Sequence, residues 1–124
     1  MDPAAPIIEV HDLVVQYGDR KVLDGINLSI RKGETFVILG GSGCGKSTLL
    51  RTLVGLLRPA SGAILFNGMD MATADADALV AMRRKMGMCF QGSALFNSMT
   101  IGDNVALPLR EHTKLEGSTI DIMT

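Results

Sequence analysis

The segment Gly40-Gly41-Ser42-Gly43-Cys44-Gly45-Lys46-Ser47 decides the fold, because it fits the pattern G-x-x-x-x-G-K-[ST] of a phosphate-binding loop. Residues 35–39 before it are apolar and β-rich, which predicts a buried parallel strand. Residues 48–57 after it carry apolar side chains at a helical period. A glycine-rich loop between a strand and a helix predicts an α/β fold with a P-loop NTPase core.

The residues of this loop suit the chemistry of phosphate binding. Glycines let main-chain N–H groups approach a phosphate closely, and the start of the following helix adds positive potential. Lys46 offers a charge to the terminal phosphates, and Ser47 offers a hydroxyl to Mg²⁺. The alternative is a glycine-rich turn followed by chance by a lysine and a serine. The candidate phosphate-binding residues are Gly40, Gly41, Ser42, Gly43, Cys44, Gly45, Lys46, Ser47 and Thr48.

Bulk properties limit the other functions that this chain can have. It has 124 residues, of which 47% are hydrophobic and 20% charged, as expected of one globular domain and not of a disordered chain. The net charge of −1 argues against nucleic acid as the main partner. Residues 1–6 lack the basic start and apolar core of a signal peptide, and no apolar run is long enough to span a bilayer.

The two cysteines have no metal-ligand spacing, and their small number suits a reducing cytosol. Cys89 lies in an apolar run, which predicts a core position. Cys44 lies in the phosphate loop, where it is either a small tolerated side chain or, as the alternative, a redox-sensing thiol.

Further elements are expected on both sides of the loop. A β-rich section before it predicts antiparallel strands at residues 7–16, 21–23 and 26–30. After the loop we expect strands at 63–66 and 86–90, a turn at Asn67-Gly68 and a helix over 75–85.

The basic end of that helix, Arg83-Arg84-Lys85, is expected to be solvated. Another helix is expected from residue 101 or 102, interrupted by Pro108.

A last helix is predicted from Glu116 to Thr124, with Ser118 or Thr119 as its cap and no stop signal. After residue 48, no run of four apolar residues is followed by an acidic residue of the kind that helps to hold Mg²⁺. We therefore expect residues 1–124 to be the truncated N-terminal part of a longer nucleotide-binding domain.

With Tyr17 before the loop and Gln91 after it, the chain resembles the ATP-binding subunit of ABC transporters, from about Ile7 to Met123. The resemblance implies that Tyr17 stacks on adenine and that Gln91 contacts Mg²⁺ and water and senses the membrane subunit. Lys46 and Gln91 would then act in catalysis, and Ser47 and Gln91 would hold the metal ion. Without the resemblance, Tyr17 is a turn aromatic and Gln91 a polar residue at a strand end.

The same resemblance implies partners and a location. It implies that the chain binds ATP and Mg²⁺, pairs with a second ATPase subunit and contacts a transmembrane permease subunit through Gln91–Asn97. The chain would lie in the cytoplasm, peripheral on the inner face of the membrane. Residues 90–96 and 103–113 look like the ATPase of Mla-type systems, which move phospholipids between the membranes of Gram-negative bacteria. Leu95 and Phe96 would be exposed contacts, or else ordinary core residues.

Features of the family that are absent from the sequence limit the predicted activity. Its signature segment, catalytic glutamate and switch histidine do not occur here, so we expect this chain alone to hydrolyse little or no ATP. Three alternatives stay open: a small kinase or GTPase, a non-catalytic module that responds to nucleotide, and a soluble ABC protein that acts on ribosomes or DNA. The near-neutral charge weighs against the last.

Overall fold

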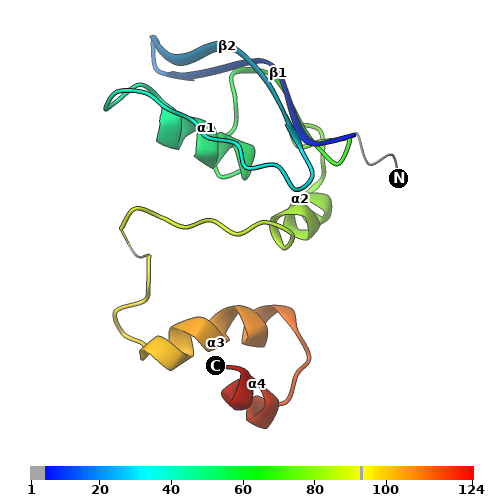
Figure 1. Ribbon diagram of the computed structural model, residues 1–124, viewed down its shortest axis with the longest axis vertical. Helices are drawn as coiled ribbons and strands as arrows, with labels where there is room; N and C mark the ends of the chain where they lie inside the picture. The colour runs from blue at the N-terminus through cyan, green and yellow to red at the C-terminus, as the bar shows by residue number, and fades with distance from the viewer. Residues whose placement is uncertain (1–4, 93) are drawn as a thin grey trace. The chain divides into compact units, whose positions relative to one another are not determined.

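In a computed structural model, which describes residues 5–92 and 94–124, four strands form an antiparallel sheet in the order β2-β1-β3-β4. The paired strands β1 and β2 lie side by side in Figure 1. The strands are β1 (Pro6–Tyr17), β2 (Arg20–Arg31), β3 (Ser61–Phe66) and β4 (Met69–Asp70). The predicted antiparallel section is confirmed, although residues 21–23 and 26–30 belong to one strand. Residues 1–4, on which part of the signal-peptide prediction depends, lie outside the described residues.

The predicted turn at Asn67-Gly68 is confirmed and joins β3 to β4. Phe66 pairs with Met69, and Asn67 and Gly68 have φ values of 50° and 77°. Two consecutive residues with positive φ make the tight loop whose twist matches the flanking strands. β4 itself was not expected from the sequence, because its two residues are too few to show a pattern.

A bulge bends β1 where its pairing with β3 shifts between His11 and Val14. Gly62 of β3 has a φ of 90°, and a Cβ on it would lie 2.5 Å from the carbonyl oxygen of Asp12, so only glycine fits. The N–H of Asp12 donates to Asn27 Oδ1 at 2.9 Å, and Asn27 Nδ2 donates to Asp12 Oδ1 at 2.9 Å. A side chain of β2 therefore fixes the bulge of its neighbour.

The helix after the phosphate loop, α1, spans Lys46–Leu53 and is shorter than the predicted 48–57. It ends early because Gly55 adopts a left-handed φ of 72°, a conformation that closes helices and favours glycine. Inside the helix, the buried hydroxyl of Thr52 donates to the carbonyl oxygen of Thr48 at 2.7 Å, so its burial leaves no polar group unpaired.

The second helix, α2, spans Ala76–Arg83 and confirms the centre of the predicted 75–85 segment. It begins at Asp75, whose carboxylate accepts a hydrogen bond from the N–H of Ala78 at 2.8 Å. At its other end, Arg83 donates through Nη2 to the carbonyl oxygen of Gly55 at 2.6 Å. One member of the basic trio thus ties α2 to the end of α1 instead of being only solvated.

Apolar side chains from the sheet, α1 and α2 meet in one core. Leu13 of β1 is 0% exposed and lies among residues of the other elements. The buried members are Val10, Leu13, Val15, Leu23, Leu49, Leu53, Ile64, Phe66, Met71 and Met82. This core holds the β1–β2 hairpin and α1 together, and so fixes the surroundings of the phosphate loop.

Two predicted strands are not formed. Residues 35–39 and 86–90 pair with no strand within the described part of the chain. Val37 and Leu39 are 66% and 87% exposed, and Cys89, predicted to be core, is also exposed. A strand exists through hydrogen bonds to a neighbour, whereas an apolar run in the sequence reports only on side chains. These predictions are therefore wrong in this structure.

The chain divides after Met88 into two units, and the second unit, from Cys89 to Thr124, begins with irregular chain and then forms helices (Figure 1). Helices α3 (Ile101–His112) and α4 (Gly117–Met123) contact each other. Their buried apolar side chains are Ala106 and Ile120.

Two details of these helices differ from the prediction. α3 continues through Pro108 to His112, because proline removes only one backbone donor and the later turns keep their hydrogen bonds. α4 begins at Glu116 without a side-chain cap, so the prediction that Ser118 or Thr119 caps it is wrong. Over the described ranges 5–92 and 94–124, no helix has the length and apolar character of a membrane span.

Candidate functional site

The predicted phosphate loop leads directly into the N-terminus of α1. Gly45 precedes the helix with a φ of 99° and a side chain of one hydrogen, so no side chain accepts a hydrogen bond from the first amides. The first intrahelical bond runs from the N–H of Leu49 to the carbonyl oxygen of Gly45 at 2.8 Å. The amides before it have no partner inside the helix, and they carry the positive end of its dipole. This end of α1 is open to an anion.

Contact with β2 explains why position 45 is a glycine. A Cβ there would lie 2.9 Å from Leu23 Cδ2 and 3.1 Å from Val22 Cγ1, and the left-handed φ would strain any other residue. At Gly41, by contrast, a Cβ would meet no atom within 4 Å. At Gly40 it would lie 2.5 Å from Cys44 Sγ. The glycines of the motif are thus not equivalent.

The side chain of Lys46 folds back over the loop. Its Nζ donates to the carbonyl oxygens of Gly40 at 2.7 Å and Gly41 at 2.6 Å, and lies 3.6 Å from Cys44 Sγ. These contacts hold one positive charge close to the open end of α1. A helix N-terminus and an ammonium group together form a site that favours phosphate.

A hollow of about 300 Å³ brings this loop together with the β1–β2 hairpin. Tyr17, half exposed at 50%, contributes to the lining from β1, and Lys46, Ser47 and Thr48 contribute to it from the start of α1. The full lining is Tyr17, Arg20, Val22, Gly43, Gly45, Lys46, Ser47 and Thr48. The structure therefore gathers residues that the sequence places far apart.

Arg20 and Val22 are the lining residues that the sequence analysis did not single out. Arg20 pairs with Tyr17 directly across the two-residue turn of the hairpin. A signal was available, because residues on either side of such a turn lie side by side. Val22 has no comparable signal, since its approach to Gly45 depends on how β2 packs against α1.

Other predicted site residues lie outside the hollow. Four of them are exposed in the loop before α1 and do not line the hollow: Gly40, Gly41, Ser42 and Cys44. Gln91 is exposed in the second unit, so its roles toward Mg²⁺, water and the membrane subunit stay predictions.

Magnesium has only a sparse protein ligand set. The part of the chain that the structure describes has no group of three or more His, Cys, Asp or Glu residues able to hold a metal ion. Ser47 supplies a hydroxyl in the hollow, which fits Mg²⁺ bound mainly by phosphates and water. A second cavity, of about 320 Å³, contains no predicted site residue; Arg58 and Arg83 are among its lining.

The region predicted to contact a permease exposes large apolar side chains. Leu95 and Phe96 are 55% and 57% exposed, so the alternative that they are ordinary core residues does not hold. Within the predicted Gln91–Asn97 contact region, Ser93 lies outside the described residues. The remaining residues lead to the N-terminus of α3.

A capping network closes that end of α3. Thr100 accepts from the N–H of Asp103 at 3.1 Å, and its hydroxyl donates to Asp103 Oδ2 at 2.6 Å. Arg110 donates to Asp103 Oδ1 at 3.1 Å. The hydrogen bond from Thr100, followed by that from Arg110, holds the pKa of Asp103 below its ordinary value of 3.8.

Comparison with known proteins places these features in a family context. The model of the ABC transporter family matches residues 23–123. The intermembrane phospholipid transport system ATP-binding protein MlaF of Haemophilus influenzae is 45% identical over 114 residues, 92% of this chain and 43% of MlaF. The probable ribonucleotide transport ATP-binding protein mkl of Mycobacterium leprae is 45% identical over 118 residues, 95% of this chain and 34% of mkl.

A solved structure supports the fold. The dimeric ATP-binding cassette MJ0796 in a post-hydrolysis state, bound to ADP and Pi, aligns with a TM-score of 0.83 and 30% identity, over 93% of this chain and 53% of that one. The predicted fold class is thereby confirmed. The chain spans less than half the length of the curated relatives it matches.

Proposed function

The chain belongs to the ABC transporter family, and from that membership we propose that it is the ATP-binding subunit of a transporter that carries phospholipid. One observation carries the nucleotide part of the proposal: the open N-terminus of α1, the ammonium of Lys46 and the ring of Tyr17 border one hollow. An adenine ring on Tyr17 and a triphosphate at the loop would use all three features.

In the proposed complex, each residue of the hollow has a distinct role. The phosphates receive hydrogen bonds from the loop amides and from Lys46, whose Nζ donates to the Gly40 and Gly41 carbonyl oxygens in this structure. Ser47 offers its hydroxyl to Mg²⁺, which when bound neutralises charge on the phosphates. Gln91, which lies outside the hollow, keeps the roles that the family resemblance implies: it contacts Mg²⁺ and water and senses the membrane subunit.

Calorimetric titration with MgATP tests nucleotide binding. We expect Lys46→Ala to weaken binding about 10- to 100-fold, because hydrogen bonds to charged groups contribute about 1.5–3 kcal/mol. Lys21→Ala is a matched control, since it removes an exposed lysine that pairs with Asp24 outside the hollow. Equal affinity of wild type and Lys46→Ala would contradict the proposed site.

The proposal extends to partners and location. The chain pairs with a second ATPase subunit, and a transmembrane permease subunit docks on residues 91–97 at the inner, cytoplasmic face of the membrane. The dimeric state of the structural relative and the exposure of Leu95 and Phe96 support this arrangement.

We also propose that this chain alone hydrolyses little or no ATP. Among the described residues, the lining of the hollow includes no carboxylate that could act as a general base toward an attacking water. Phosphate release by the purified 124-residue chain measures this, with Lys46→Ala as the blank. Sustained turnover that Lys46→Ala abolishes would contradict the proposal.

Similarity to MlaF favours a phospholipid substrate. Because mkl has the same identity to this chain, 45%, ribonucleotides are a second candidate. The assembled transporter, reconstituted in vesicles with labelled phospholipid, distinguishes the two. We expect ATP-dependent movement of the lipid, lost in Lys46→Ala. Uptake of ribonucleotide without lipid movement would favour the second candidate.

A further inference from the structure

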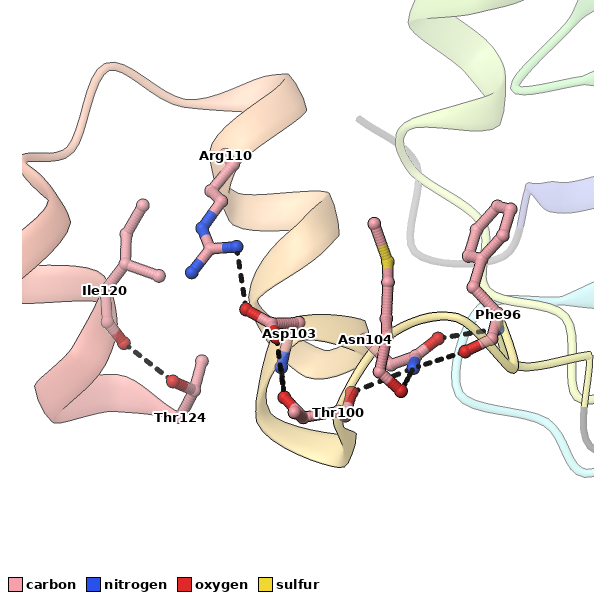
Figure 2. Close-up of polar contacts among 8 residues, drawn as sticks. Phe96, Thr100, Asp103, Asn104, Arg110, Ile120 and Thr124 are labelled. Carbon is pink, nitrogen blue, oxygen red and sulfur yellow. Dashed lines mark hydrogen bonds and ion pairs between the residues drawn. The ribbon is translucent and has the colours of Figure 1, made fainter.

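Asn104, in the first turn of α3, reaches back to the loop that precedes the helix (Figure 2). Its Oδ1 accepts from the N–H of Phe96 at 2.8 Å, and its Nδ2 donates to the carbonyl oxygen of Phe96 at 3.1 Å. Nδ2 also donates to the carbonyl oxygens of Thr100 at 2.9 Å and Met99 at 3.4 Å. One side chain thus engages both main-chain polar groups of Phe96.

Only a side-chain amide can make this set of bonds at the length of asparagine. It accepts through oxygen and donates through nitrogen at the same time. A carboxylate of the same shape would keep the bond from the Phe96 N–H but would face three carbonyl oxygens without a proton to donate. Alanine would leave the Phe96 N–H to water, while the carbonyl oxygens of Phe96 and Thr100 would keep only their main-chain bonds from the N–H groups of Met99 and residue 104.

The effect of these bonds is to fix main chain while leaving apolar side chains exposed. The Phe96 carbonyl oxygen also accepts from the Met99 N–H at 3.1 Å, which closes the turn. Yet the side chains of Leu95 and Phe96 remain more than half exposed. A loop ordered before binding avoids part of the entropy cost of ordering it in a complex.

We propose that Asn104 is a positioning residue of the docking surface, which is the segment 91–97 on which the permease subunit docks. Asn104 holds the main chain of residues 96–100, so that the side chains of Leu95 and Phe96 are exposed to an apolar segment of the permease subunit. The docking role rests on the proposed function. The hold on the loop does not, because it follows from the hydrogen bonds of the second unit alone.

The neighbouring cap network supplies a matched control. Thr100, Asp103 and Arg110 stabilise the same end of α3 (Figure 2) but make no hydrogen bond to Phe96. Asp103→Ala therefore loosens the helix start and leaves the bonds of Asn104 to Phe96 in place. If Asn104 acted only by stabilising α3, the two substitutions would have the same consequences.

The experiment uses the chain co-purified with its permease subunit, as wild type and as Asn104→Ala, Asn104→Asp and Asp103→Ala. Hydrogen exchange of the Phe96 amide reports on the loop. We expect Asn104→Ala to raise its exchange rate at least about tenfold, because this variant removes the acceptor of the Phe96 N–H. Asn104→Asp should raise it less, because the carboxylate keeps that acceptor and loses only the bonds to the carbonyl oxygens. Asp103→Ala should raise it much less.

Affinity for the permease subunit is the second measurement. We expect Asn104→Ala to weaken it about tenfold in the wild-type background and to have almost no effect in a Phe96→Ala background, because residues that act through one contact are not additive. ATP affinity should be unchanged in all variants.

Unchanged Phe96 exchange, an equal effect of Asp103→Ala, or additive losses with Phe96→Ala would each overturn the inference. A wild-type chain that binds no permease subunit would contradict the proposed partner and the docking role with it. The exchange rates would still decide whether Asn104 holds the loop.

Discussion

The N-termini of α1 and α3 differ in how their first amides are satisfied. α1 begins after Gly45, which offers no side chain to them, whereas α3 begins at Thr100, whose hydroxyl accepts from Asp103. All helices leave their first N–H groups without partners inside the helix. α3 closes its end with its own residues, so its start contributes to stability. The N-terminus of α1 has no side-chain cap, so its first N–H groups can bind a ligand but add no capping hydrogen bond to the stability of the fold.

The largest expected effect comes from replacing Gly45, the residue before α1 that offers no side-chain cap. We expect Gly45→Ala to abolish MgATP binding and to lower the free energy of unfolding by about 1–3 kcal/mol, because its φ of 99° and the nearby Leu23 Cδ2 strain any Cβ. Calorimetry and denaturant unfolding measure the two effects.

Gly41→Ala is the control, since a Cβ there meets no atom within 4 Å. We expect it to change stability little. If Gly45→Ala and Gly41→Ala had equal effects on stability, the open start of α1 would not depend on the conformation of Gly45.

The second-largest expected effect concerns Tyr17, the aromatic residue that lines the hollow. We expect Tyr17→Ala to weaken binding of adenine nucleotides by about 1–3 kcal/mol, by analogy with other base–aromatic contacts, and Tyr17→Phe to retain most of the affinity. Titration with ATP and with inorganic triphosphate separates stacking from phosphate contacts. Equal losses for both ligands in Tyr17→Ala would exclude stacking.

The closed helix start gives a smaller effect, confined to the second unit. We expect Thr100→Ala to lower the stability of α3 by about 1 kcal/mol, because the first turn loses its cap. Hydrogen exchange of the α3 amides measures this, with Thr100→Ser as the conservative control. Nucleotide affinity should not change, and a reduced affinity would show that the cap also acts on the hollow.

Acid should loosen α3 by the smallest amount. The pKa of Asp103 is lowered in the folded chain, so its contribution is present above its ordinary value of 3.8 and is lost as the pH falls from there through the folded pKa. Hydrogen exchange of the α3 amides measures this loss, and their protection should fall below about pH 4. Asp103→Asn should remove the dependence, and an unchanged acid response in that variant would assign it to another group.

Turns and helices that depend on a few neighbouring residues could be predicted from the sequence. The turn at Asn67-Gly68 follows from two residues that tolerate positive φ, and both adopt it. The start of α1 at the phosphate loop and the helix around Leu79 follow from glycine spacing and apolar period. Lys46 was predicted as a site residue from the loop motif and Tyr17 from the family resemblance, although the hollow that both residues line could not be predicted.

The failures have a common origin in contacts between distant segments. Residues 35–39 and 86–90 have the composition of strands but pair with none in the described chain. The bulge at Asp12 depends on Asn27, fifteen residues later, and on the absence of a side chain at Gly62. Composition does not state which backbone groups will meet, so such pairings are invisible in a single sequence.

By itself, the sequence determined that this chain carries a phosphate loop opening a helix, because spacing and glycine conformation act over a few neighbouring bonds. Tertiary structure decided that the loop faces Tyr17 and Arg20, and that Asn104 holds Phe96. The physical reason is that packing and hydrogen bonding join residues by distance in space, and only the folded chain sets those distances.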